Sequence, residues 1–148
     1  MDACHISFKD ESFDLVVGKE VLHHLDVGIV AAEINRILKK GGKAIFVEPL
    51  AHNPISNLWR KMTPKRRTAS EWPLSYAEIH EMGRNFVSTT YEEFDLLTLL
   101  SSFIYLVTRS TSLKWKAGEV FSKAEIPFLK RFSMVKRLCA SILIQFTK

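Results

Sequence analysis

A strand–helix–strand pattern near the start of the chain constrains the fold more than any other feature. Residues 13–17 form an apolar, β-branched run that stops at Gly18, which is typical of a strand. A second apolar run covers residues 43–48 and stops at Pro49. Both runs are nearly continuous in apolar residues, as expected of strands that are covered on both faces. The pattern therefore predicts two parallel strands with helices on both sides of their sheet.

A helix is predicted between these two strands. Asp26 is a suitable N-cap, and four apolar residues follow at the spacing of one helical face: Val30, Ile34, Ile37 and Leu38. Lys39 and Lys40 suit the negative end of the helix dipole, and Gly41 suits a left-handed stop. Strand, helix and strand together span residues 13–48, which is the size of one βαβ unit with a right-handed crossover.

The remaining elements are predicted from shorter signals. Residues 50–74 are mixed, with three prolines, and predict an irregular segment with one short helix near residues 56–62. Ser75 and Glu78 form a capping-box pattern ahead of a helix that ends at Gly83. Three further elements follow from apolar content: a strand over residues 85–91, a helix over 94–107 and a strand over 141–147. The chain is therefore expected to form an α/β sheet with at least four strands.

Charge and cysteine usage limit the partners that the chain is expected to have. The net charge is +5, and residues 110–148 carry eight Lys/Arg against two Asp/Glu. Such an excess attracts an acidic lipid surface, a phosphorylated substrate or nucleic acid, but it also describes a solvated lysine-rich face. No nucleic-acid motif accompanies it, so no nucleic-acid partner is expected. Cys4 and Cys139 lack the spacing of a metal site, which favours a cytoplasmic protein with reduced thiols and no metal.

Three collinear motifs extend the strand–helix–strand pattern. They cover residues 2–17, residues 21–25 and residues 33–42. In content and spacing they resemble the methyltransferase type 11 branch of the class I S-adenosylmethionine (SAM)-dependent methyltransferases. The chain departs from the family pattern at Ser7 and Lys40, where proline is usual. The resemblance covers the first third of the chain, and the rest agrees in layout only.

The resemblance implies a partial Rossmann-like methyltransferase sheet, made of the C-terminal strands of the family's seven-stranded fold with flanking helices. Residues 1–148 would form a single, N-terminally truncated domain, with residues 50–74 and 94–138 as substrate-side or lid insertions. The family's glycine-rich loop and its ribose-binding acidic residue would lie before Asp2, and neither occurs in this sequence. We therefore expect a fragment with an unpaired central strand edge, which would favour a homodimer or pairing with the missing N-terminal half.

The resemblance also implies which residues would meet the cofactor. Asp2 and Ala3 would contact the adenine ring, because a carboxylate accepts from its amino group and a backbone N–H donates to a ring nitrogen. Gly18 and Lys19 would lie beside the methionine part of SAM, at the carboxyl end of a strand where open α/β sheets bind ligands. Val21 would pack near the cofactor. The alternatives are a frayed terminus for Asp2 and a simple strand-end turn for Gly18.

Three side chains are the catalytic candidates. His23 and His24 would face the substrate side, and Glu48 would end the family's fifth strand; each could act as a general base when the acceptor is a hydroxyl. The alternatives are a structural or exposed histidine and a glutamate that only caps a turn. No metal is required, because the methyl group of SAM is already activated by its sulfonium.

The predicted function is methyl transfer from SAM to a small, hydrophobic acceptor, lipid-like or phosphate-bearing. This expectation rests on the apolar and aromatic content of residues 50–74 and 94–138, whose edges are basic. For Trp59, Trp72 and residues 94–107, we favour a packed core over a substrate pocket. Two alternatives stay open: a non-catalytic half-domain that pairs with another chain, and a basic module that contacts a membrane surface.

Overall fold

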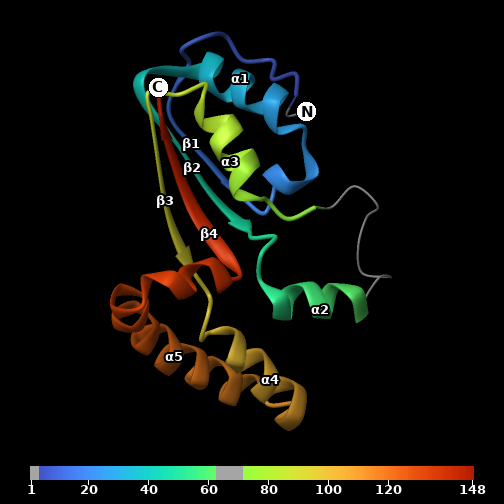
Figure 1. The fold of residues 1–148 in the computed structure, drawn as a ribbon. Helices are drawn as coiled ribbons and strands as arrows, with labels where there is room; N and C mark the ends of the chain where they lie inside the picture. Colours follow the sequence, from blue (N-terminus) through green and yellow to red (C-terminus); the bar gives the residue numbers. More distant parts are fainter. Residues whose placement is uncertain (1–3, 63–71) are drawn as a thin grey trace.

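The computed structural model describes residues 4–62 and 72–148 of the chain (Figure 1). Its elements are β1 (Phe13–Lys19), the 3-10 helix η1 (Leu22–His24), α1 (Val27–Ile37), β2 (Leu38–Pro49), α2 (Pro54–Met62), α3 (Tyr76–Gly83), β3 (Ser88–Phe94), α4 (Leu99–Thr108), α5 (Thr111–Arg131), the 3-10 helix η3 (Ser133–Leu138) and β4 (Ser141–Thr147). No helix of the described residues has the length and apolar content needed to cross a bilayer.

The strands form one sheet in the order β1-β2-β4-β3. β1 and β2 are parallel, with Val16 opposite Ala44, which confirms the predicted βαβ unit. β4 runs antiparallel to both of its neighbours, β2 and β3. β1, β2 and β3 therefore all point the same way, and their carboxyl ends meet at one edge of the sheet. The mixed sheet confirms the predicted α/β class.

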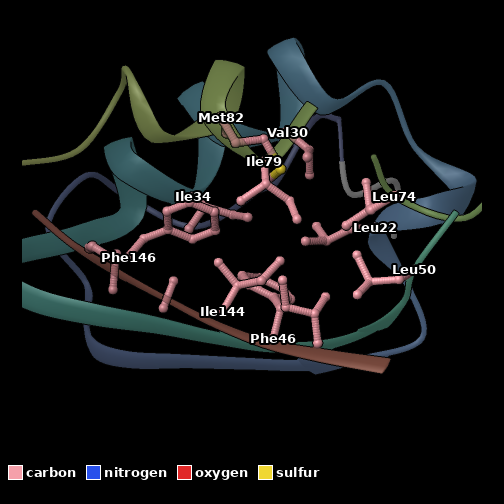
Figure 2. Close-up of a cluster of buried hydrophobic side chains, with 14 residues drawn as sticks. Leu22, Val30, Ile34, Phe46, Leu50, Leu74, Ile79, Met82, Ile144 and Phe146 are labelled. Carbon is pink, nitrogen blue, oxygen red and sulfur yellow. The ribbon is translucent and has the colours of Figure 1, made fainter. Parts of the chain in front are cut away.

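One face of the sheet carries the core, under α1 and α3 (Figure 1). Figure 2 shows Phe46, Ile144 and Phe146 pointing from the sheet toward Ile34 of α1 and Met82 of α3. All five side chains are buried. Fully burying a side chain of this size contributes about 1.5–3 kcal/mol, so this single layer of contacts supplies most of the stability of the sheet.

The opposite face of the sheet is exposed at its apolar centre. Leu15 and Val17 of β1 are 51% and 68% exposed, and Leu143 of β4 is 38% exposed. The expectation of helices on both faces is therefore wrong for the described residues. The physical reason is that α1 and α3, which lie between the strands in sequence, both pack on the same face. β1 is also an edge strand, because β2 is its one partner among the described strands.

The predicted end of the first helix is wrong. α1 ends at Ile37, and Leu38 already pairs with Phe13 as the first residue of β2. Lys39 therefore lies in a strand, where its ammonium contacts Asp14 at 2.7 Å instead of the helix terminus. Gly41 does adopt the left-handed conformation, at φ 75°, but within β2. Pairing with β1 outweighs the local helix-stop signal.

Two later boundaries also differ from the sequence expectation. The third strand runs from Ser88 to Phe94 rather than over residues 85–91, because Asn85 and Phe86 turn back on the end of α3 through hydrogen bonds to Met82 and Gly83. The predicted helix over 94–107 begins only at Leu99.

The start of that helix is displaced because Phe94 belongs to β3, paired with Ser141. Asp95 then turns the chain with a φ of 63°. The capping box of Ser75 and Glu78 and the final strand over residues 141–147 are confirmed.

The interpretation of the tryptophans as core residues is wrong for Trp72, which is 72% exposed. The side chain of Trp59 lies outside the described structure. The apolar residues of 94–107 are largely exposed as well, since Phe103 is 48% and Val107 83% exposed. These side chains do not join the sheet core, which is filled by the layer under α1 and α3.

Candidate functional site

The carboxyl ends of β1 and β2 bring a histidine and a glutamate together. Glu48 lies one residue before the end of β2, and its side chain is fully buried. His23 lies on η1, which follows β1, and its side chain is 5% exposed. The His23 Nδ1 atom is 2.7 Å from Glu48 Oε2. Two of the three predicted catalytic side chains therefore form a buried pair, although 25 residues separate them in sequence.

Glu48 also holds the backbone that carries the histidine. Its Oε1 atom accepts hydrogen bonds from the backbone N–H groups of Val21 and Leu22, at 2.8 Å each. A carboxylate can only accept hydrogen bonds, so the network assigns the proton between the two side chains to His23 Nδ1. In the neutral imidazole the basic lone pair then resides on Nε2. Glu48 thereby fixes both the position and the tautomer of the ring.

His24 is placed differently from its neighbour. It is exposed, and its ring contacts that of His23 in a tilted arrangement, with centroids 4.1 Å apart and an interplanar angle of 39°. Two adjacent histidines that looked equivalent in sequence are thus separated by the structure. His23 is buried against a carboxylate, and His24 lies on the solvent side of the same turn.

The predicted cofactor residues lie around the same strand end. Gly18 is the penultimate residue of β1, and a Cβ atom there would be 2.5 Å from the ring of Phe46. Glycine is therefore required at this position for packing against Phe46, whether or not a ligand is bound. Lys19 is exposed and its ammonium lies 3.9 Å from the Glu20 carboxylate. Val21 is half-buried beside the histidine turn.

The chain before β1 is held against α1 by one arginine. The Arg36 guanidinium donates to the backbone oxygens of Ile6 and Phe8 and to the Asp10 carboxylate. It also bonds to Glu33, and this contact lowers the pKa of Glu33 to about 2. The predicted adenine contacts, at positions 2 and 3, lie outside the described residues. The segment that leads into them is nevertheless anchored.

Two features of this sheet edge were missed by the sequence analysis. Glu20 follows β1 with a left-handed φ of 51°, and its N–H donates to Val47 O at 2.8 Å. Backbone strain of this kind clusters at functional sites. No sequence signal indicates it, because a glutamate is not the residue type that usually marks a left-handed position.

The second missed feature is a polar pair on the same face of the sheet as Glu48. Glu93 of β3 and Glu48 of β2 both lie opposite Ile142 of β4 in register. Glu93 accepts a hydrogen bond from the Tyr76 hydroxyl at 3.1 Å, and His52 stacks on the Tyr76 ring. Burial raises the pKa of Tyr76 above its usual range. Among the described residues, no group of three or more metal-ligating side chains is gathered.

Comparison with known sequences identifies the first third of the chain. A sequence model of the methyltransferase domain family matches residues 1–46. An uncharacterized protein of Escherichia coli strain K12, YafE, is 34% identical over 67 residues. That match covers 44% of this chain and 32% of the E. coli protein. The chain therefore spans about a third of the length of this curated relative.

Comparison with solved structures identifies the fold. Phosphoethanolamine N-methyltransferase 2 of Haemonchus contortus, in complex with phosphomonomethylethanolamine and S-adenosylhomocysteine, superposes with a TM-score of 0.58 and 17% identity. The likeness covers 99% of this chain and 36% of that one. Geranyl diphosphate C-methyltransferase of Streptomyces coelicolor A3(2), in complex with Mg²⁺, geranyl diphosphate and S-adenosyl-L-homocysteine, has a TM-score of 0.56 and 13% identity. Here the likeness covers 99% of this chain and 50% of that one.

The sequence match is confined to the first third of the chain, and the fold match extends over nearly all of it. The resemblance to the type 11 branch of the class I SAM-dependent methyltransferases is confirmed by sequence for residues 1–46. For the rest of the chain the solved structures show a likeness of fold alone.

Proposed function

We propose that this chain is part of a SAM-dependent methyltransferase that transfers a methyl group to a small, hydrophobic acceptor. The observation that carries the proposal is the buried contact between His23 and Glu48. It lies where open α/β sheets bind their ligands, at the carboxyl ends of parallel strands. His23 also lies within the residues that match the methyltransferase family. A buried base beside a cofactor edge is a suitable arrangement for group transfer.

The cofactor would lie beside the end of β1. Lys19 and Glu20 present an ammonium and a carboxylate 3.9 Å apart, which complement the amino-acid end of SAM in charge. Asp2 and Ala3 would take the adenine ring by resemblance. The charged pair fits the cofactor, whereas the glycine-rich loop that cradles it in the family is not part of this sequence. We therefore propose that a second segment completes the site.

The exposed edge of β1 is the place for that segment. Leu15 and Val17 leave an apolar surface on β1, and the outer edge of β1 has no partner among the described strands. Such edges attract further strands. The chain spans about a third of its relatives, so the segment is either more of the same polypeptide or another chain. A homodimer is the variant of this proposal in which a second copy covers the edge.

His23 would act as the general base in the reaction. SAM, when bound, supplies a methyl group already activated by its sulfonium. Glu48 keeps the proton on Nδ1, so Nε2 is the nitrogen that takes a proton from an acceptor hydroxyl or ammonium. As the imidazole becomes positively charged, the buried carboxylate of Glu48 stabilises it. His24 is a second candidate, and its exposure favours contact with an acceptor rather than proton transfer.

The acceptor would be held by residues 50–74 and 94–138, the segments expected to form the substrate side. Their described parts include α2 and the α4–α5 hairpin, which lie at the sheet edge where β2 and β3 end (Figure 1). Two proteins with this fold bind a prenyl diphosphate and a phosphobase. A hydrophobic or phosphate-bearing small acceptor is consistent with both comparisons and with the apolar surface of these helices.

A chimera tests the proposal. The chimera keeps the part of the E. coli relative that precedes the matched segment. Residues 1–148 of this chain replace the matched segment and the rest of that protein. We expect the folded chimera to bind SAM and to methylate a hydrophobic acceptor. His23→Gln should lower kcat by about 10²–10⁴ without changing SAM affinity. His24→Gln, which removes an acceptor contact but leaves the base, should raise KM more than it lowers kcat. Failure of a folded chimera to bind SAM would refute the methyltransferase proposal and favour the non-catalytic half-domain. Equal kcat for His23→Gln and wild type would refute the role of the histidine.

A further inference from the structure

The α4–α5 hairpin exposes an apolar surface that the sheet does not use. On α4, Leu100, Phe103 and Val107 follow one another at helical spacing and are 42%, 48% and 83% exposed. On α5, Leu113 and Val120 stand seven residues apart, at 46% and 64% exposed. Residues at these spacings lie on one side of each helix. We call these five residues the hairpin face.

A groove between α4 and α5 adjoins the α5 half of the hairpin face. It has a volume of about 420 Å³ and is lined by Ile104, Leu113, Lys116, Ala117, Val120 and Phe121. Leu113 and Val120 of the hairpin face line the groove directly, and α4 contributes Ile104, which neighbours Phe103 in sequence. No acidic side chain lines it, and Lys116 contributes the one charge.

The segment that carries this groove has a net positive charge. Residues 99–138 contain eight Lys/Arg and two Asp/Glu. Of the two acidic side chains, Glu125 is buried, and Glu119 is bonded to Lys123 at 2.7 Å. An apolar surface framed by cations is complementary to a membrane with anionic headgroups and acyl chains beneath them.

Glu125 fixes the hairpin to the end of β3. Its carboxylate accepts four backbone N–H bonds, from Asp95, Leu96, Leu97 and Thr98, at 2.6–3.2 Å. The turn that leads into α4 is thus fastened to α5. The hairpin projects beyond the sheet, on the side where β2 and β3 end (Figure 1). The exposed apolar rows therefore belong to an anchored element and not to a frayed one.

We propose that the hairpin face docks this protein on an anionic lipid surface. The apolar rows would enter the boundary between headgroups and acyl chains, and the surrounding Lys and Arg side chains would contact the headgroups. A second copy of the chain is the less suitable occupant, because stacking two such faces would bring two sets of uncompensated cations together.

This inference goes beyond methyl transfer and does not depend on it. It concerns α4 and α5, whereas the proposed reaction depends on His23 and Glu48. Docking would, however, place the sheet edge that carries that pair toward the lipid, because the hairpin and the pair lie at the same end of the strands (Figure 1). A hydrophobic acceptor could then be taken from the membrane surface.

Vesicle co-sedimentation of the full 148-residue chain tests the inference. We expect binding to phosphatidylcholine vesicles that contain phosphatidylserine, and binding at least about tenfold weaker to phosphatidylcholine alone. Raising the salt concentration should weaken the binding, since exposed charges are screened. Val107→Asp together with Val120→Asp should reduce it by more than about tenfold, as two apolar side chains no longer enter the boundary.

Matched variants separate this surface from the rest of the chain. Val87→Asp changes a side chain that is 86% exposed between α3 and β3, and it should leave vesicle binding unchanged. Lys116→Glu should weaken binding, whereas Lys40→Glu, an exposed position on β2, should weaken it much less. Circular dichroism checks that each variant is folded. Equal binding to neutral and anionic vesicles, or equal loss with Val87→Asp, would overturn the proposal. The proposal would also be overturned if the wild-type chain bound no vesicles and formed a dimer that the double variant Val107→Asp, Val120→Asp dissociates.

Discussion

The βαβ unit and the α4–α5 hairpin are both rich in apolar side chains, yet they place them in opposite environments. In the βαβ unit, Val30, Ile34 and Phe46 are buried under one face of the sheet. In the hairpin, Phe103 and Val107 face solvent. The difference teaches that apolar content alone does not identify a core. Burial depends on whether an element finds a facing surface, and the exposed side of the hairpin finds none among the described residues.

The two regions are alike in their buried glutamates. Glu48 of the βαβ unit accepts two backbone N–H bonds and one from His23. Glu125 of the hairpin accepts four backbone N–H bonds and one from the Thr98 hydroxyl. Each carboxylate fastens a turn. Glu48 differs in that one of its oxygens orients a titratable side chain, and this difference marks the first region as the candidate site.

The largest loss of stability should come from truncating a side chain that is buried between the sheet and the helices α1 and α3. Phe146→Ala removes a fully buried ring that stacks on Phe86, and we expect it to lower the free energy of unfolding by about 3–5 kcal/mol. Phe103→Ala, the same substitution in the hairpin, should change it by less than about 0.5 kcal/mol. Urea unfolding measures both. Comparable losses would mean that the hairpin has a buried core of its own.

Removal of the hairpin glutamate should have the next largest effect. Glu125→Ala leaves buried N–H groups of residues 95–98 without an acceptor, and we expect a loss of about 2–3 kcal/mol. Amide hydrogen exchange should accelerate at those residues before it does in the sheet. Glu119→Ala, in an exposed ion pair, is the control and should cost less than about 1 kcal/mol. If exchange at residues 95–98 stays slow, the turn is held by something other than Glu125.

A smaller effect on stability, with a distinct spectroscopic signature, is expected for the other glutamate. Glu48→Gln keeps the shape of the side chain but weakens its hydrogen bonds, for a loss of about 1–2 kcal/mol. In the wild type, ¹⁵N NMR of the imidazole rings should show His23 protonated at Nδ1 when neutral. The variant should lose that preference, while the ring of His24 keeps its own. An Nε2–H tautomer in the wild type would contradict the assigned network.

The last effect is the smallest at neutral pH and develops only at alkaline pH. Burial, with the charge of Glu125 as the next cause, raises the pKa of the Cys139 thiol from 9.0 to about 12. The unfolded chain therefore loses this proton first, so stability is complete below about pH 9 and declines as the pH rises toward about 12. Replacing the thiol by Cys139→Ala should flatten part of that decline. Urea unfolding midpoints of the wild type and Cys139→Ala, measured between about pH 9 and pH 12, check this prediction. If the thiol ionised as readily in the folded as in the unfolded chain, the two proteins would show the same pH dependence.

The sequence was sufficient for elements whose signals are local and mutually consistent. Asp26 caps α1, the capping box starts α3, and the last strand occupies residues 141–147 as predicted. Prediction from the sequence failed where pairing between distant residues decides the structure. Leu38 leaves the helix because it pairs with Phe13.

The same distinction holds for the candidate site: single residues could be predicted from the sequence, but the contacts between distant residues could not. The resemblance pointed to His23 and Glu48 individually, but only the fold brings them within 2.7 Å. Glu125 gave no signal at all, because a glutamate in a lysine-rich helix is usually solvated. Its burial depends on a turn 27–30 residues away in sequence. Contacts of that range leave no periodic pattern in the chain.

The central claim is that the carboxyl ends of β1 and β2 form the cofactor side of a methyltransferase. The most direct test is an NMR titration of the ¹⁵N-labelled 148-residue chain with S-adenosylhomocysteine. Without the glycine-rich loop, we expect weak, saturable binding with a Kd on the order of millimolar. The amide shifts should be confined to residues 18–23 and the end of β2, and Lys19→Glu should weaken the binding. Saturable shifts that map elsewhere, or no shifts at all from the folded chain, would contradict this account.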